Sequence, residues 1–350
     1  MDLPPLFLLK KGVAWTEEFI LVSPAFKRHD RCAVSSVVEH LPDTEGVTGS
    51  NPVSRTIFPF LASLHALRTA IAAAPPSPEE LDALLRLLDD ETPAVRERVT
   101  ERVGLCGGDL SEWLATQPHV LNRQDQSLLV EMLRPARREI LVRDWIAPSG
   151  GAMALHEDWE SFEALLRTIS DFLHDGITLR QPLSDALDLL MEEAIDDGVT
   201  DADELRTFLF NNSRLIGNRK EYDDPRNSDL AWSIAEGRSN PLGLCLIFML
   251  VGRRLGFEIE GINFPGHFMC RIYEDGSPLI VDCFEQGQLH LQSTLLESPE
   301  LSRAQRSFLS QTAAPGAILL RLIGNLHQAL EKAGRSNDAL LIKELLASLV

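Results

Sequence analysis

Apolar residues recur at helical spacing over most of the chain. Residues 159–173 and 183–196 each carry one apolar face and predict amphipathic helices. Asn240 followed by Pro241 is typical of a helix start, because Asn can cap the first turn and Pro is favoured at its first position. The segment that follows is apolar nearly all round until Gly256, which predicts a buried helix.

Short strand patterns follow this helix. Residues 258–261, 268–273 and 279–283 predict strands, and residues 275–277 predict a hairpin turn between the last two. Helical patterns dominate elsewhere. The sequence therefore predicts a mostly helical α+β fold in which the buried helix packs on an antiparallel sheet, with helical hairpins on either side.

The segment 58–145 is helical in pattern. Its order of helix, Asp-rich turn, Pro, Val, Arg and helix resembles a HEAT-type repeat. Only one or two units are present, whereas solenoids need about three for stability, so a plain helical hairpin fits equally well. Such helices could be a docking surface or a cover for the neighbouring domain. Residues 146–156 are rich in Gly, Ala and Pro-Ser and predict a linker.

Residues 1–57 follow no sustained period of either helix or strand. The stretch 35–57 resembles the peptide obtained when a transfer-RNA gene is translated. We therefore expect the functional chain to begin near Phe58. The alternative is a poorly ordered N-terminal extension.

Charge and cysteine content narrow the class of protein. A net charge of −19 argues against a nucleic-acid partner and against an anionic membrane surface. The odd number of cysteines, without CxxC or zinc-ligand spacing, predicts free thiols in a reducing compartment and no metal or other cofactor. No apolar run is long enough to span a bilayer, so we expect a cytoplasmic protein. The five cysteines are Cys32, Cys106, Cys245, Cys270 and Cys283.

Four motifs follow one another between residues 217 and 287. Gly-Asn precedes Tyr-x-x-Pro-x-Asn-Ser (217–228), and Asn-Pro opens a helix that ends in Arg-Arg-Leu-Gly (240–256). Phe-Pro-Gly-His-Phe (264–268) and Ile-x-Asp-x-Phe-x-x-Gly (280–287) complete the series. In order and spacing they resemble the SirB-type transglutaminase-like family. The resemblance implies a papain/transglutaminase-like domain over residues 155–295.

The resemblance also assigns roles to individual residues. In this architecture a nucleophilic Cys lies at the start of the central helix, and a His and an Asp lie on the following strands; His267 and Asp282 match the latter two. Residues 240–243 contain no nucleophile. Cys245 lies about one turn deeper, where the helix dipole helps less. Cys245 is thus either a working nucleophile or a buried apolar cysteine.

The other polar or sulfur-bearing residues near these motifs have structural interpretations as well as functional ones. Cys270 and Cys283 are expected in the core, on the strand faces opposite His267 and Asp282. Arg271 could pair with Asp282, bind an anion, or be an edge charge. Asn240 and Asn227 are candidate binding residues, although capping or turn roles fit both positions.

The C-terminal residues 301–350 predict a helical pair. It resembles the tetratricopeptide-like end of SirB relatives and includes Leu-Arg-x-x-x-Asn-Leu at residues 320–326. One pair is too short to form a peptide groove by itself and is expected to pack against the central domain.

The preferred hypothesis is a non-catalytic cytoplasmic protein with a protein or peptide partner, in which His267 and Asp282 are structural. The alternative is a cysteine hydrolase or acyltransferase that uses Cys245, His267 and Asp282. A third possibility is a His–Asp acid–base pair that acts on water.

Overall fold

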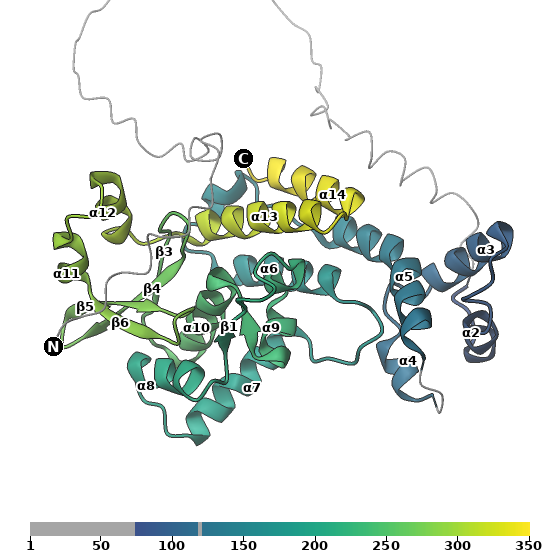
Figure 1. Cartoon of the computed structure of the whole chain (residues 1–350), viewed down its shortest axis with the longest axis horizontal. Helices are drawn as coiled ribbons and strands as arrows, with labels where there is room; N and C mark the ends of the chain where they lie inside the picture. Colours follow the sequence, from purple (N-terminus) through teal and green to yellow (C-terminus); the bar gives the residue numbers. More distant parts are fainter. Residues whose placement is uncertain (1–73, 118–120) are drawn as a thin grey trace, which may run out of the picture. The chain divides into compact units, whose positions relative to one another are not determined.

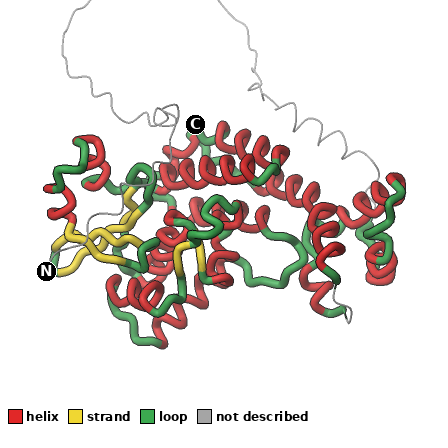
Figure 2. The backbone as a smooth tube through the Cα atoms, viewed as in Figure 1, coloured by secondary structure: helices red, strands yellow, loops and turns green. Residues whose placement is uncertain are grey.

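The computed structural model describes residues 74–117 and 121–350, so the predicted extension 1–57 and the predicted helix after it lie outside the described residues. Helices make up most of the described part, and the strands form one four-stranded sheet and a separate two-stranded pair (Figure 1, Figure 2). The fold is α+β, as predicted. The longer helices are α2 (Pro78–Leu85), α3 (Pro93–Gly104), α5 (Arg123–Asp144), α6 (Trp159–Leu173), α7 (Leu183–Asp196), α10 (Pro241–Leu255), α13 (Pro315–Lys332) and α14 (Ser336–Ala347).

Short elements connect these helices. The α-helical ones are α4 (Ser111–Ala115), α8 (Ala202–Arg206), α9 (Leu230–Glu236), α11 (Gln292–Glu297) and α12 (Arg303–Leu309). Two 3-10 helices span Gly151–Leu155 and Pro225–Ser228, and a π-helical turn spans Thr207–Asn211.

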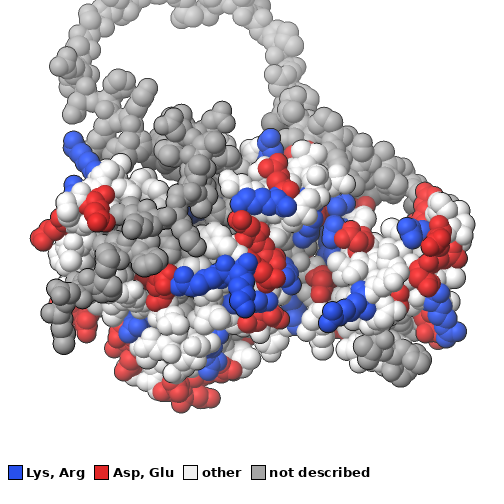
Figure 3. Space-filling model, in the orientation of Figure 1, with Lys and Arg blue, Asp and Glu red and all other residues white. Residues whose placement is uncertain are grey.

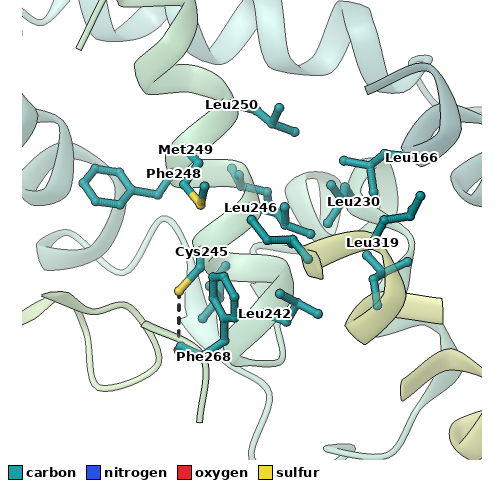
Figure 4. Packing of buried hydrophobic residues seen from close by; sticks show 14 of the residues in the cluster. Leu166, Leu230, Leu242, Cys245, Leu246, Phe248, Met249, Leu250, Phe268 and Leu319 are labelled. Carbon is teal, nitrogen blue, oxygen red and sulfur yellow. Dashed lines mark hydrogen bonds between the residues drawn. The ribbon is translucent and has the colours of Figure 1, made fainter. Parts of the chain in front are cut away.

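The central helix α10 has the predicted start and end. The Asn240 side chain accepts a hydrogen bond from the Gly243 N–H, which satisfies one of the unpaired donors of the first turn. Gly256 ends the helix with a φ of 78°, a left-handed conformation that glycine adopts without steric cost. Every residue from Pro241 to Gly252 is buried, so α10 forms the middle of the main core (Figure 4).

Four strands form an antiparallel sheet in the order β3-β4-β5-β6. The β4–β5 hairpin aligns Cys270 with Val281 and Arg271 with Ile280. A separate parallel pair joins β1 and β2, with Ile216 opposite Arg238. The bounds are β1 (Ile216–Gly217), β2 (Arg238–Ser239), β3 (Glu260–Ile262), β4 (Met269–Glu274), β5 (Ser277–Asp282) and β6 (Gln288–Leu291).

The four-stranded sheet is apolar on both faces. On one face Cys270, Ile272 and Val281 join the main core around α10. On the other face Met269 and Ile280 join a smaller cluster with residues of α11 and α12. Because neighbouring residues of a strand point to opposite faces, the nearly continuous apolar run of β5 reflects burial on both sides.

The N-terminal helices have a core of their own. Leu81 and Leu84 of α2, Val99 and Val103 of α3, and Leu129 of α5 are buried together. Residues 86–92 separate α2 from α3, and Pro93 opens α3, as the Asp-rich turn and Pro predicted. This region is therefore packed around an independent apolar cluster.

Residues 146–156 correct the prediction of a linker. They include the 3-10 helix Gly151–Leu155, whose Leu155 is fully buried in the main core. The Ala152 N–H donates to the Leu349 carbonyl at 2.8 Å. At Gly316 of α13 an added Cβ would lie 1.9 Å from the Ala152 carbonyl oxygen. The segment is therefore held tightly by α13 and by the chain's last residues.

The distribution of surface charge and the composition of the helices both bear on the predictions from the sequence. On the face drawn in Figure 3, acidic and basic side chains are intermingled. Over residues 74–117 and 121–350, none of the helices combines the length and the apolar composition required to cross a membrane.

Candidate functional site

His267 and Asp282 lie together at the end of the sheet. The His267 Nε2 atom is 2.8 Å from Asp282 Oδ1. Gly266 has a φ of 78°, which makes the tight turn from Phe264 to His267 possible without strain, and the His267 N–H donates to the Phe264 carbonyl. Asp282 is the last residue of β5, so the strand end and the turn bring the two side chains together.

The Asp282 carboxylate is fixed by further hydrogen bonds. Its Oδ1 accepts from the main-chain N–H groups of Phe284 and Glu285, both at 3.1 Å, and the residue is 2% exposed. Burial alone would lower the pKa of His267, but the hydrogen bond and the negative charge of Asp282 outweigh it, so that this pKa is raised. The pair can therefore hold a proton and fix the orientation of the imidazole.

Cys245 lies on α10 and is fully buried. Its Sγ donates to the carbonyl oxygen of Phe268 at 3.5 Å, as the dashed line in Figure 4 shows. Within the described part of the chain no hydrogen bond joins this sulfur to the His267 ring. The sulfur is thus directed at the main chain next to His267 and is closed off from solvent.

The start of α10 has no space for a nucleophile at Gly243. A Cβ added there would lie 2.2 Å from the Ser239 Oγ and 2.9 Å from the Asn227 carbonyl oxygen. Ser239 is itself fixed, because its Oγ donates to the Asn227 carbonyl and accepts from Ser233. Gly243 is therefore required by the packing of the helix start.

Cys270 and Cys283 are buried as predicted. They are not isolated core residues, however: the sulfurs of Cys245, Cys270 and Cys283 all lie within 4.8 Å of one another. We call these three residues the thiol cluster. They are the side chains of the described site that could hold a metal ion, and their chain separation left no spacing signal in the sequence.

The three thiols of the thiol cluster differ in pKa. Burial raises the pKa values of Cys270 and Cys283 well above the ordinary thiol value. Burial acts in the same direction on Cys245, but the neighbouring thiols of Cys270 and Cys283, with help from the His267 charge, lower its pKa to about 6. The thiol of Cys245 is therefore the most acidic of the three.

The predicted binding residues have partners within the protein. Arg271 pairs with Glu260 at 2.6 Å and donates to Thr312, which corrects the suggested Arg271–Asp282 pair. Arg271 is 5% exposed, which also corrects the suggestion of a solvent-facing edge charge. The Asn240 side chain caps α10.

Asn227 has a similar internal role. It is 1% exposed, its Nδ2 donates to the carbonyls of Glu221 and Tyr222, and its Oδ1 accepts from Asn218. These bonds fix the loop that leads to α9, as a turn role requires.

Sequence reasoning did not single out Arg321, which lies near His267. Its guanidinium is 5.4 Å from the centre of the Phe268 ring, and its Nη1 donates to the Phe264 carbonyl at 2.8 Å. In the described part of the chain it has no carboxylate partner, and burial lowers its pKa to about 10. The Arg of the Leu-Arg-x-x-x-Asn-Leu motif was a signal that could have found it.

Two aromatic rings lead from His267 toward the surface. The His267 ring is 6.2 Å from the Phe284 ring, edge to face, and Phe284 in turn meets Tyr222 at 5.9 Å. The Arg219 guanidinium lies 5.1 Å from the centre of Phe284. Tyr222 is 42% exposed, so this row of side chains connects His267 with the surface.

Comparisons with known proteins agree with this architecture. Residues 178–324 match the family model described as the transglutaminase-like superfamily. A "UPF0162 protein" of Xylella fastidiosa (strain Temecula1) is 34% identical over 145 residues, which are 38% of this chain and 50% of that protein. "UPF0162 protein PA3419" of Pseudomonas aeruginosa is 36% identical over 125 residues, 33% of this chain and 43% of that protein.

A more distant relative comes from an animal. "F-box only protein 21" of Mus musculus is 27% identical over 112 residues, 32% of this chain and 17% of that protein. The matches thus cover half or less of these relatives' own lengths. No solved structure matches the chain significantly. Residues 178–324, less than half of the chain, are therefore similar to the transglutaminase-like superfamily.

Proposed function

We propose that this chain is a SirB-type transglutaminase-like protein that catalyses no reaction and acts in the cytoplasm by binding a protein or peptide. The helices described between residues 74 and 145, part of the predicted HEAT-like region 58–145, and the predicted tetratricopeptide-like helices at residues 301–350 would frame the binding domain. The transglutaminase-like superfamily match and the uncharacterised UPF0162 relatives are compatible with this proposal.

The start of α10 is the observation that carries the proposal. The architecture places its nucleophile there, and residues 240–243 supply none. Gly243 has no space for a side chain, because Ser239 and the main chain of Asn227 occupy it. Cys245 is fully enclosed and bonds to the Phe268 carbonyl. An attacking sulfur must be both ionised and reachable, and this one is not reachable.

The surface beside His267 would supply the binding chemistry. Tyr222 is exposed and packs on the buried Phe284, and Arg321 offers a largely buried guanidinium without a carboxylate partner in the described residues. A guanidinium binds carboxylates in bidentate geometry, and aromatic residues with Arg are enriched where proteins bind partners. We therefore propose a partner that presents a carboxylate beside an apolar group.

The alternative of a cysteine hydrolase or acyltransferase rests on two observations. The His267–Asp282 hydrogen bond has the geometry of a base and its orienting group, and the pKa of Cys245 is lowered to about 6. Catalysis would then require α10 and the sheet to separate and expose the sulfur. A His–Asp pair acting on water would instead retain activity after removal of Cys245.

Thiol labelling distinguishes the non-catalytic protein from the cysteine-dependent enzyme. We expect native metal-free protein to react slowly with iodoacetamide at Cys245 and faster at the half-buried Cys106, because reaction requires contact with the sulfur. The rate at Cys245 should be unchanged in His267→Ala. Peptide mass spectrometry would locate the label, and unfolding in urea should equalise the two rates.

The opposite pattern supports the enzyme. Fast labelling of Cys245, with an apparent pKa well below the free value of about 8.5 and lost in His267→Ala, would identify an activated Cys–His pair. Cys106→Ala is the control for this labelling. It removes the reference thiol without changing α10 or the sheet, so the labelling rate of Cys245 should stay as in the wild type.

A further inference from the structure

The thiol cluster is built from three parts of the chain that are distant in sequence. Cys245 comes from α10, Cys270 from β4, and Cys283 directly follows β5. All three residues are 0% exposed, and their sulfurs lie within 4.8 Å of one another. The packing of α10 on the sheet therefore creates a closed site lined by sulfur.

The spacing suits a small metal ion. A Zn–S bond is about 2.3 Å long, so sulfurs that share one zinc ion lie about 3.8 to 4.0 Å apart in tetrahedral or trigonal geometry. The three sulfurs are close enough to reach this spacing by small side-chain rotations. Thiolate ligands select soft or borderline d10 ions, chiefly Zn2+ and Cu+.

Without a metal, the thiols have only weak partners. Cys245 Sγ donates to the Phe268 carbonyl at 3.5 Å, and Cys270 Sγ donates to the Cys245 carbonyl at 3.8 Å. Within residues 74–117 and 121–350, no charged side chain forms a hydrogen bond with any of the three sulfurs. The thiols are thus available as metal ligands, and the Phe268 carbonyl oxygen is available as a fourth ligand.

Charge favours zinc over copper. Three thiolates with Zn2+ carry a net charge of −1, and with Cu+ they carry −2. A buried net charge is costly unless an opposite charge compensates it. The Arg321 guanidinium lies 5.4 Å from the centre of the ring of Phe268, the residue whose carbonyl accepts from Cys245 Sγ, and in the described residues it has no carboxylate partner. One guanidinium neutralises the zinc site, whereas the copper site would keep an excess negative charge.

We propose that Cys245, Cys270 and Cys283 bind one thiophilic d10 cation, with Zn2+ preferred over Cu+. On binding, three S–H bonds break, three metal–sulfur bonds form and three protons leave for the solvent, without any change of oxidation state. The ion would join α10 to β4 and to the end of β5. This inference does not depend on whether the surface beside His267 binds a partner.

Metal competition on the full chain tests the proposal. Reduced metal-free protein would be titrated with Zn2+ against a chromophoric chelator, and with Cu+ against bicinchoninate under anaerobic conditions. We expect one equivalent of zinc to be bound and to raise the melting temperature. Cys270→Ala and Cys283→Ala should each weaken zinc binding by more than about 100-fold, since loss of a mere orienting residue costs about 10- to 100-fold.

Cys106→Ala and Cys32→Ala are the matched controls and should bind zinc like the wild type. Tighter binding of Cu+ than Zn2+ would overturn the charge argument and the stated preference. Zinc uptake that persists in Cys245→Ala/Cys270→Ala/Cys283→Ala would place the metal elsewhere and overturn the site.

A measurement on the wild-type protein tests the site even if the cysteine variants do not fold. Co2+ bound by thiolates produces an intense near-ultraviolet charge-transfer band that oxygen and nitrogen ligands do not give. We expect this band to saturate at one equivalent and to disappear on addition of Zn2+. If Co2+ gives no such band and Zn2+ does not bind, the three thiols are packing residues only and the proposal fails.

Discussion

His267 is held between a carboxylate and an aromatic ring. Its Nε2 bonds to Asp282 Oδ1 at 2.8 Å, and Phe284 covers its side. Its pKa is raised in the folded protein, so the protonated imidazole is stabilised relative to the unfolded chain. This contribution is complete below the unfolded value of about 6.5, and it is lost as the pH rises through the higher folded value.

Replacement of Asp282 by Asn should reverse this effect. Asn keeps an oxygen that can accept from the Phe284 and Glu285 N–H groups but removes the charge. We expect the pKa of His267 to fall in Asp282→Asn. The stability advantage of the wild type should be greatest near pH 6 and should shrink toward pH 9. NMR titration of the His267 ring and urea denaturation at several pH values would measure both quantities.

Glu274→Gln is the control, because this carboxylate is exposed on β4 and lies outside the pair. It should leave the His267 titration unchanged. An unchanged His267 pKa in Asp282→Asn would show that Asp282 is not the source of the shift.

The element that decides the chemistry of the domain is the first turn of α10. Asn240 caps it, Pro241 opens it, and Gly243 lets the helix approach Ser239 and Asn227. The same close approach that stabilises this turn excludes a side chain at position 243. Glycine in α13 differs, since a Cβ at Gly324 would meet nothing within 4 Å.

The same substitution should therefore have opposite effects in the two helices. We expect Gly243→Ala to destabilise the protein by about 1–3 kcal/mol through overpacking. Gly324→Ala should stabilise it by about 0.4–1 kcal/mol, because alanine lowers the entropy of the unfolded chain without a clash. Guanidinium denaturation of both variants would measure the two changes. Stabilisation by Gly243→Ala would mean that the helix start can accommodate a side chain after all.

At the scale of the molecule, a buried ion cluster joins α14 to α5. Asp338 of α14 is fully buried and pairs with Arg138 of α5 and with Arg335. Arg134 of α5 is 3.8 Å away. In a protein with a net charge of −19, this cluster gathers more basic than acidic groups, so the loss of its carboxylate leaves arginines uncompensated.

Removal of the Asp338 charge should strongly destabilise the fold. Breaking a buried ion pair by removing one partner costs about 3–5 kcal/mol, and we expect a loss in this range for Asp338→Asn in chemical denaturation. The exposed pair Asp223–Lys332, 2.8 Å apart, also connects the C-terminal helices to the rest. Asp223→Asn should cost at most about 1 kcal/mol. Equal losses in the two variants would contradict a special role for Asp338.

The sequence by itself determined the local elements. Periodicity gave the bounds of α6 and α7, and Asn240, Pro241 and Gly256 gave those of α10, because caps and breakers act over one turn. It also predicted the β4–β5 hairpin, and through the family resemblance the nearness of His267 and Asp282, which lie just before β4 and at the last residue of β5.

Only the tertiary structure decided which side chains from distant segments meet. The thiol cluster, the position of Arg321 beside His267 and the Arg271–Glu260 pair depend on how α10, α13 and the sheet pack, and no spacing in the chain records them. Hydrophobic burial drives this packing without direction, so an apolar pattern predicts that α10 is buried but not which atoms it faces. The enclosure of the Cys245 sulfur, on which the proposed function depends, is a property of that packing alone.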